Sequence, residues 1–176
     1  MLSHLSLLKR RWLIHPSLPN FATILERKPF AVTQTEFEER EGKFSPDGRW
    51  IAYVSNSSGP FEVYIQPFPG PGQQVRVSTR GGAQVQWRAD GRELFYIALD
   101  GKLMAVPIDM AANGQAMTPG IPIPLFTTRV GRIIGPASSG PQYVVSADGK
   151  RFLMSTLVQD GSSSPIRVIV NWKPQR

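Results

Sequence analysis

The sequence has no cysteine and only two histidines, His4 and His15, among its 176 residues. Without cysteine there are no disulfides and no thiolate ligands, and two histidines near the N-terminus are too few for a zinc site. The same scarcity leaves no well-placed base for a Ser-His-Asp triad, and no G-x-S-x-G or G-x-x-x-x-G-K-[ST] sequence occurs. The sequence therefore predicts no catalytic residues, no metal site and no bound cofactor.

Long apolar runs are also missing, since no stretch approaches the 18 or more apolar residues of a membrane span. The formal net charge is +7, but the bases are spread along the chain and do not gather on one element. Nucleic-acid binders concentrate their bases on one face or helix. The sequence thus argues against nucleic acid as a partner.

Residues 1–26 differ in composition from the rest and form an atypical leader. Leu5, Leu8 and Trp12 fall at helical spacing beside three bases, which permits a short basic helix that ends before Pro16. Two readings stay open: a helix that binds a membrane surface or a partner, and an irregular leader with no role. The bases follow a weak apolar stretch, whereas a secretory signal places them before one. With no export signal, the chain as it stands is expected in the cytoplasm.

Glycine and proline are abundant, at 16 residues each, and they supply turns. An Asp-Gly pair followed by a base and an apolar run occurs three times. Asp-Gly signals a hairpin, because a tight primed turn needs positive φ at its central residues. Each turn offers one carboxylate, whereas a calcium loop brings several together, so each aspartate is expected to hydrogen-bond its own turn. The predicted structural turn residues are Asp47, Gly48, Asp90, Gly91, Asp148 and Gly149.

The spacing of these turns predicts an all-β fold of about three four-stranded antiparallel blades. The first two turns lie 43 residues apart, as in a propeller blade, and the next two lie 58 apart. Residues 95–99 and 152–154 are apolar on both strand faces, which indicates sheets covered on both sides. The expected blades lie near residues 43–80, 83–128 and 142–172. Aromatic residues expected in the core are Trp50, Tyr53, Tyr64, Trp87, Tyr96 and Trp172.

Three blades are too few to close a propeller ring, which typically has four to eight. Each apolar side chain left uncovered on an end blade forfeits about 1.5–3 kcal/mol of burial. We therefore expect a partial propeller over residues 27–176. Missing blades or self-association are expected to cover its ends.

Residues 44–53, of sequence FSPDGRWIAY, resemble the repeat of TolB-like (WD-like) β-propellers, whose blades read W-S-P-D-G-R-x-I-A-F. Residues 38–42, 63–70, 91–96 and 168–172 resemble the C-terminal end of propellers associated with serine/threonine kinases of acidobacteria and related soil bacteria. The likeness covers residues 27–176. It implies that earlier blades and any kinase domain are missing, as in a truncated or separately started gene, so kinase activity is not carried over.

The resulting prediction is a non-catalytic recognition or scaffold module. Two long connections, residues 109–123 and 129–141, are expected to contact a protein or a small ligand, because loops on rigid scaffolds commonly bind. The alternative is a sensor or accessory propeller of an enzyme, either a serine/threonine kinase or a prolyl-oligopeptidase-like peptidase, whose catalytic domain is absent from this chain.

Overall fold

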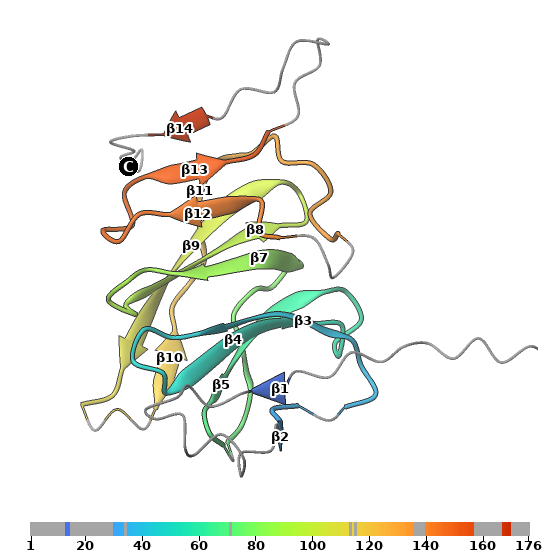
Figure 1. Ribbon diagram of the computed structural model, residues 1–176, viewed down its shortest axis with the longest axis vertical. Helices are drawn as coiled ribbons and strands as arrows, with labels where there is room; N and C mark the ends of the chain where they lie inside the picture. The colour runs from blue at the N-terminus through green and yellow to red at the C-terminus, as the bar shows by residue number, and fades with distance from the viewer. Residues whose placement is uncertain are drawn as a thin grey trace, which may run out of the picture.

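The computed structural model describes residues 13–14, 30–33, 35–70, 72–112, 114, 116–135, 140–156 and 167–169. Regular structure within these ranges is entirely β, in antiparallel sheets that lie one above another (Figure 1). The search for a helix long and apolar enough to span a membrane found none in this described part. The all-β prediction is therefore confirmed.

Blade 1 is a four-stranded sheet in chain order: β3 (Glu39–Phe44), β4 (Trp50–Ser55), β5 (Glu62–Pro67) and β6 (Val75–Arg76). It starts at Glu39, slightly before the predicted boundary at residue 43. The pairing of β3 with β4 shifts register between Arg40 and Lys43, where β3 carries a bulge. The blade thus has the predicted hairpins, with a kink in its first strand.

Blade 2 contains β7 (Gly82–Trp87), β8 (Glu93–Ala98), β9 (Lys102–Met110) and β11 (Ile123–Thr127), and it spans residues 82–127 where residues 83–128 were predicted. The connection predicted over residues 109–123 is different. Strand β9 continues to Met110 and pairs with β10 (Met117–Pro119). The expectation of an irregular loop here is wrong, because this segment folds as a hairpin that prolongs the sheet.

Blade 3 contains β12 (Tyr143–Val145), β13 (Phe152–Met154) and β14 (Arg167–Ile169) among the described residues. These strands fall inside the predicted blade 142–172. Strand β1 (Leu13–Ile14), in the leader, pairs with β2 (Phe30–Ala31), which follows the leader. The expectation of a helix that continues to Pro16 is therefore wrong at Leu13 and Ile14, which form a strand. The rest of that helix, with Leu5, Leu8 and Trp12, lies outside the described residues, as does Trp172.

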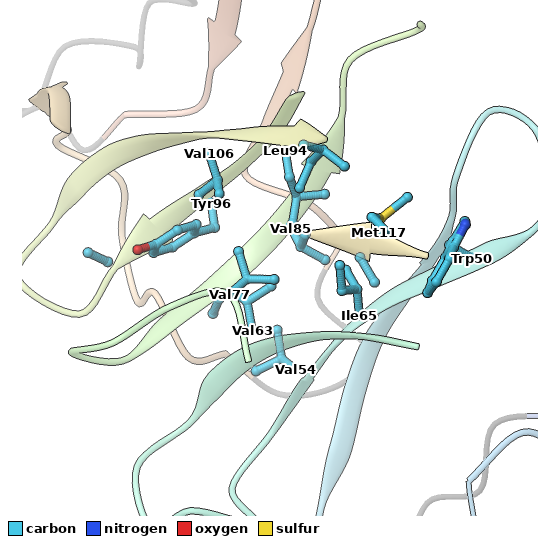
Figure 2. Close-up of a cluster of buried hydrophobic side chains, with 14 residues drawn as sticks. Trp50, Val54, Val63, Ile65, Val77, Val85, Leu94, Tyr96, Val106 and Met117 are labelled. Atoms are coloured by element: carbon cyan, nitrogen blue, oxygen red, sulfur yellow. The ribbon is translucent and has the colours of Figure 1, made fainter. Parts of the chain in front are cut away.

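Two apolar layers hold the blades together, because β8 contributes side chains to both. Leu94 and Tyr96 lie in the layer between blades 1 and 2, whereas Phe95 and Ile97 lie in the layer between blades 2 and 3. This alternation confirms that the second strand is covered on both faces. Figure 2 shows the first layer, with labelled side chains from blade 1 (Trp50, Val54, Val63, Ile65, Val77) and blade 2 (Val85, Leu94, Tyr96, Val106, Met117).

The two outer faces of the stack differ. On blade 1, Ile51, Tyr53 and Tyr64 are buried, and Val32 and Phe68 pack against them. On blade 3, Val144 is 48% exposed and its cross-strand partner Leu153 is 41% exposed. Among the described residues, the chain itself covers this face of blade 1, whereas Val144 and Leu153 stay exposed on blade 3. The expectation that residues 152–154 are covered on both faces is therefore wrong at Leu153.

Candidate functional site

The first and third Asp-Gly turns share one hydrogen-bond arrangement. Asp47 Oδ1 accepts from Ser45 Oγ (2.5 Å) and from the backbone N–H of Arg49 (3.1 Å). Asp148 Oδ1 accepts in the same way from Ser146 Oγ (2.5 Å) and the N–H of Lys150 (3.1 Å). Both carboxylates are thus engaged by their own turns.

The second turn has an arginine where the others have serine. Arg88 donates to both carboxylate oxygens of Asp90 (Nε to Oδ1 2.7 Å, Nη2 to Oδ2 2.8 Å) and also to Glu93 Oε2 (3.0 Å). The hydrogen bond from Arg88 lowers the pKa of Asp90 to about 2. This carboxylate stays ionised at physiological pH, and both of its oxygens accept hydrogen bonds within its own turn.

The turn type differs from the primed turn expected from Asp-Gly. Only the glycines have left-handed φ, at 70° for Gly48, 72° for Gly91 and 73° for Gly149, and none of the three aspartates does. The N–H of Gly48 donates to Ser45 O at 2.9 Å. The two central residues of the tight turn therefore come before the glycine. The glycine itself takes the left-handed conformation with which the chain enters the next strand.

The three turns lie next to one another along the stack. A Cβ placed on Gly91 would come within 3.6 Å of Pro46 Cδ, and one on Gly149 within 2.7 Å of Arg88 Cδ. Within the described residues no group of three His, Cys, Asp or Glu side chains is placed to hold a metal ion. The row of turns is a contact between blades, built on side chains that are already hydrogen-bonded.

A second set of equivalent positions connects the inner strands of the blades. Glu41, Gln84 and Gln142 each lie six residues before the turn aspartate of their blade. The N–H of Gln84 donates to Glu41 Oε2, and the N–H of Gln142 donates to Gln84 Oε1 at 2.9 Å. Each side-chain oxygen thus receives the backbone N–H of the next blade. Sequence analysis missed these residues, although their spacing repeats that of the turns.

Backbone geometry at two of these positions is unusual. Glu41 and Gln84 have φ of 57° and 61°, which non-glycine residues seldom adopt, and both lie at the bulges of β3 and β7. Burial raises the pKa of Glu41, while the N–H of Gln84 and the charge of Arg40 act in the opposite direction. At these bulges the side-chain oxygens of Glu41 and Gln84 accept hydrogen bonds from the neighbouring blade.

The segment 129–135 lies across these inner strands and does not project as a separate loop. Three of its carbonyls accept hydrogen bonds: Arg132 O from Gln142 Nε2 (2.5 Å), Ile133 O from Gln84 Nε2 (3.3 Å) and Gly135 O from Arg40 Nη1 (2.6 Å). Ile133 also packs against both apolar layers. This part of the predicted binding connection 129–141 is thus occupied in joining all three blades.

The other predicted connection helps to form an open hollow of about 770 Å³ beside blade 1. Its floor includes Trp50 and Met117, which lie side by side at one end of the core cluster in Figure 2. Pockets of this size accommodate small ligands. The described lining residues are Arg49, Trp50, Pro67, Phe68, Pro69, Gly70, Gly72, Gln73, Val75, Gly114, Ala116 and Met117.

Two lining groups have unused hydrogen-bonding capacity. Trp50 is 4% exposed, and its Nε1 has no hydrogen-bond partner among the residues that the structure describes. Arg49 is exposed and forms no ion pair within the described part of the chain. Sequence analysis took Trp50 only as a core residue and did not single out Arg49. The hairpin opposite them had a signal in Asn113-Gly114, which is a strong hairpin dipeptide.

Comparison with known proteins supports the fold and goes no further. No protein-family model matches the chain, and no curated protein matches it. The crystal structure of TolB from Acinetobacter baumannii superposes with a TM-score of 0.54 at 17% identity, covering 82% of this chain and 32% of TolB. A putative 6-phosphogluconolactonase from Bacteroides uniformis gives 0.49 at 16% identity, covering 93% of this chain and 50% of that chain.

An oligogalacturonate lyase from Vibrio parahaemolyticus gives a TM-score of 0.48 at 16% identity, covering 70% of this chain and 31% of that one. This chain therefore spans about a third of the length of TolB and of the lyase. The blades, their order and the likeness to TolB agree with the resemblance of residues 44–53 to the TolB-like repeat. The chain has the fold of part of a TolB-like β-propeller.

Proposed function

We propose that this chain is a non-catalytic recognition module that binds a ligand in the hollow between blade 1 and the β9–β10 hairpin. The observation that carries the proposal is the hairpin itself. The segment predicted from sequence to contact a partner, residues 109–123, forms one wall of the hollow through Gly114, Ala116 and Met117. The opposite wall belongs to blade 1, so both walls are anchored in sheets.

The hairpin is held in place by hydrogen bonds and by a buried side chain, which favours a role in binding. Ala111 N donates to Ala116 O at 2.9 Å, and Gly114 N donates to Ala111 O at 2.7 Å, which closes the turn. Met117 is 6% exposed and belongs to the layer between blades 1 and 2. A wall held by a buried side chain keeps its shape, and a preformed site loses less conformational entropy on binding.

A variant in which a large side chain fills the hollow tests this proposal. Ala116 is exposed and lines the hollow, so Ala116→Trp would occupy it without entering the core. Ala147→Trp makes the same change in the exposed turn of blade 3. We expect compounds or peptides that raise the thermal unfolding temperature of the wild type to lose this effect in Ala116→Trp and to retain it in Ala147→Trp.

Two results would overturn the proposal. The first is a ligand whose effect survives in Ala116→Trp, because it binds elsewhere. The second is chemical conversion of the ligand by the purified chain, detected by mass spectrometry. The module would then be an enzyme.

A further inference from the structure

The hollow beside blade 1 has an unbalanced charge. Among its described lining residues Arg49 is the one ionised group, and neither aspartate nor glutamate is present. In the turns nearby, by contrast, Arg88 is held by two carboxylates. Asp47, two residues away in the same turn, interacts electrostatically with Arg49 but does not line the hollow. A hollow lined by a cation and by no carboxylate is complementary to an anionic ligand.

Gly114 makes room for the Arg49 side chain at the tip of the hairpin. A Cβ at residue 114 would lie 2.3 Å from Arg49 Nη1, closer than atoms tolerate, and Gly114 has φ of +66°. The guanidinium therefore lies close to the hairpin backbone at residue 114, on the side of the hollow opposite blade 1.

The remaining walls are mainly apolar and aromatic. Trp50, Phe68 and Met117 contribute large side chains, and Pro67 and Pro69 add ring carbons. Trp50 Nε1 is fully buried and has no acceptor among the described residues. An apolar ligand body would contact these rings.

We infer that this hollow binds an organic carboxylate with an apolar or aromatic body, with Arg49 holding the carboxylate. The inference rests on the proposed function and names the ligand class for the same site. Arginine pairs with carboxylates through two parallel N–H bonds, which fixes the orientation of the ligand as well as attracting it. A free carboxylic acid and the C-terminus of a peptide share this chemistry.

An NMR titration of the full-length chain separates charge from shape. The probes are N-acetyl-phenylalanine, its neutral amide, and acetyl-tetraalanyl-phenylalanine with a free C-terminus. The readout is the indole N–H resonance of Trp50, assigned by its loss in Trp50→Phe. We expect the acid to shift this resonance. The amide is expected to have a dissociation constant larger by about tenfold or more, since it lacks the charge. Tighter binding of the peptide would identify a protein C-terminus as the source.

Variants complete the test. Arg49→Gln is expected to weaken the acid about tenfold and to leave the amide unchanged, while Arg76→Gln, an exposed arginine of the same blade outside the hollow, leaves both unchanged. If the amide binds as tightly as the acid and Ala116→Trp abolishes both, the carboxylate inference fails and the proposed function stands. If no probe moves the Trp50 resonance, the inference also fails, and the wider ligand screen still decides the proposed function.

Discussion

At the scale of single residues, Tyr143 has a buried hydroxyl for which the described part of the chain offers no hydrogen-bond partner. The residue is 2% exposed, in the layer between blades 2 and 3. Leaving a buried hydroxyl without a partner costs about 1–3 kcal/mol. We expect Tyr143→Phe to raise the free energy of unfolding by about 1 kcal/mol, measured by urea denaturation with tryptophan fluorescence.

The control for this change is Tyr53→Phe. The Tyr53 hydroxyl donates to Gln74 Oε1 at 2.5 Å, so its removal is expected to lower the free energy of unfolding by about 1 kcal/mol. Opposite signs for the two variants would support the assignment. Equal losses would show that the Tyr143 hydroxyl has a partner in solution.

The Asp90 carboxylate predicts a pH effect on stability. Its folded pKa is lowered to about 2, mainly by the hydrogen bond from Arg88, so ionisation favours the folded state. This contribution is complete above the unfolded pKa of about 4 and is lost as the pH falls toward 2. We expect Asp90→Asn to be less stable than wild type at pH 7 and the difference to shrink between about pH 4 and 2, measured as urea midpoints.

Asp109→Asn is the matched control, because Asp109 is exposed and lies outside the three turns. Its difference from wild type should not close over the same window. A gap for Asp90→Asn that stays constant down to pH 2 would mean that Arg88 does not act through the ionised carboxylate.

Residues were predictable where their contacts are local. The turn aspartates bind groups within two residues along the chain, so their dipeptides reveal them. Gln84 instead bonds Glu41 and Gln142, which lie 43 and 58 residues away. No short motif marks such contacts. Only comparison of equivalent positions across blades, six residues before each aspartate, would have identified them.

At the scale of elements, Met117 attaches the β9–β10 hairpin to the core. Its side chain is 6% exposed among residues of blades 1 and 2, whereas Met110 on the paired strand is 38% exposed. Truncation of a buried methionine to alanine costs about 2–5 kcal/mol. We expect Met117→Ala to lower the free energy of unfolding by about 2 kcal/mol or more, and Met110→Ala by less than about 0.5 kcal/mol, in urea denaturation.

Similar small losses in both variants would show that the hairpin is not anchored by Met117. The wall of the hollow would then be movable, and the preformed site of the proposed function would lose its support.

Strand positions were predictable because each blade repeats short-range signals. Blade 2 runs from Gly82 to Thr127, where residues 83–128 were expected, since Asp-Gly turns and apolar runs define its strands locally. The hairpin at residues 110–117 was missed because residues 109–123 were taken as a connection, although Asn113-Gly114 is a hairpin dipeptide. Burial of Met117 against blade 1, which no local signal shows, adds to the stability of the hairpin.

At the scale of the whole molecule, the stack ends differently on its two sides. Blade 1 has its outer aromatic pair, Tyr53 and Tyr64, buried with ring centroids 5.9 Å apart. Blade 3 leaves Val144 and Leu153 half exposed, opposite each other across β12 and β13. Sequence periodicity indicated apolar residues on both faces of residues 95–99 in blade 2 and 152–154 in blade 3. It could not show which end the chain itself covers, because that depends on contacts far apart in sequence.

The open face of blade 3 predicts self-association. Two adjacent apolar side chains on a sheet face attract a second apolar surface, and each gains about 1 kcal/mol or more when covered. We expect sedimentation velocity to show concentration-dependent association of the wild type. The double variant Val144→Thr with Leu153→Thr should weaken it by about tenfold or more in dissociation constant.

Ile121→Thr provides the control, since Ile121 is 84% exposed but lies outside this face. It should leave association unchanged if the paired surface of blade 3 is what matters. Equal weakening by Ile121→Thr would point to general surface hydrophobicity, and a wild type that stays monomeric at all concentrations would show that the exposed pair is too small to bind a second copy. Association that depends on Val144 and Leu153 alone would make blade 3 the end at which this partial propeller accepts another sheet.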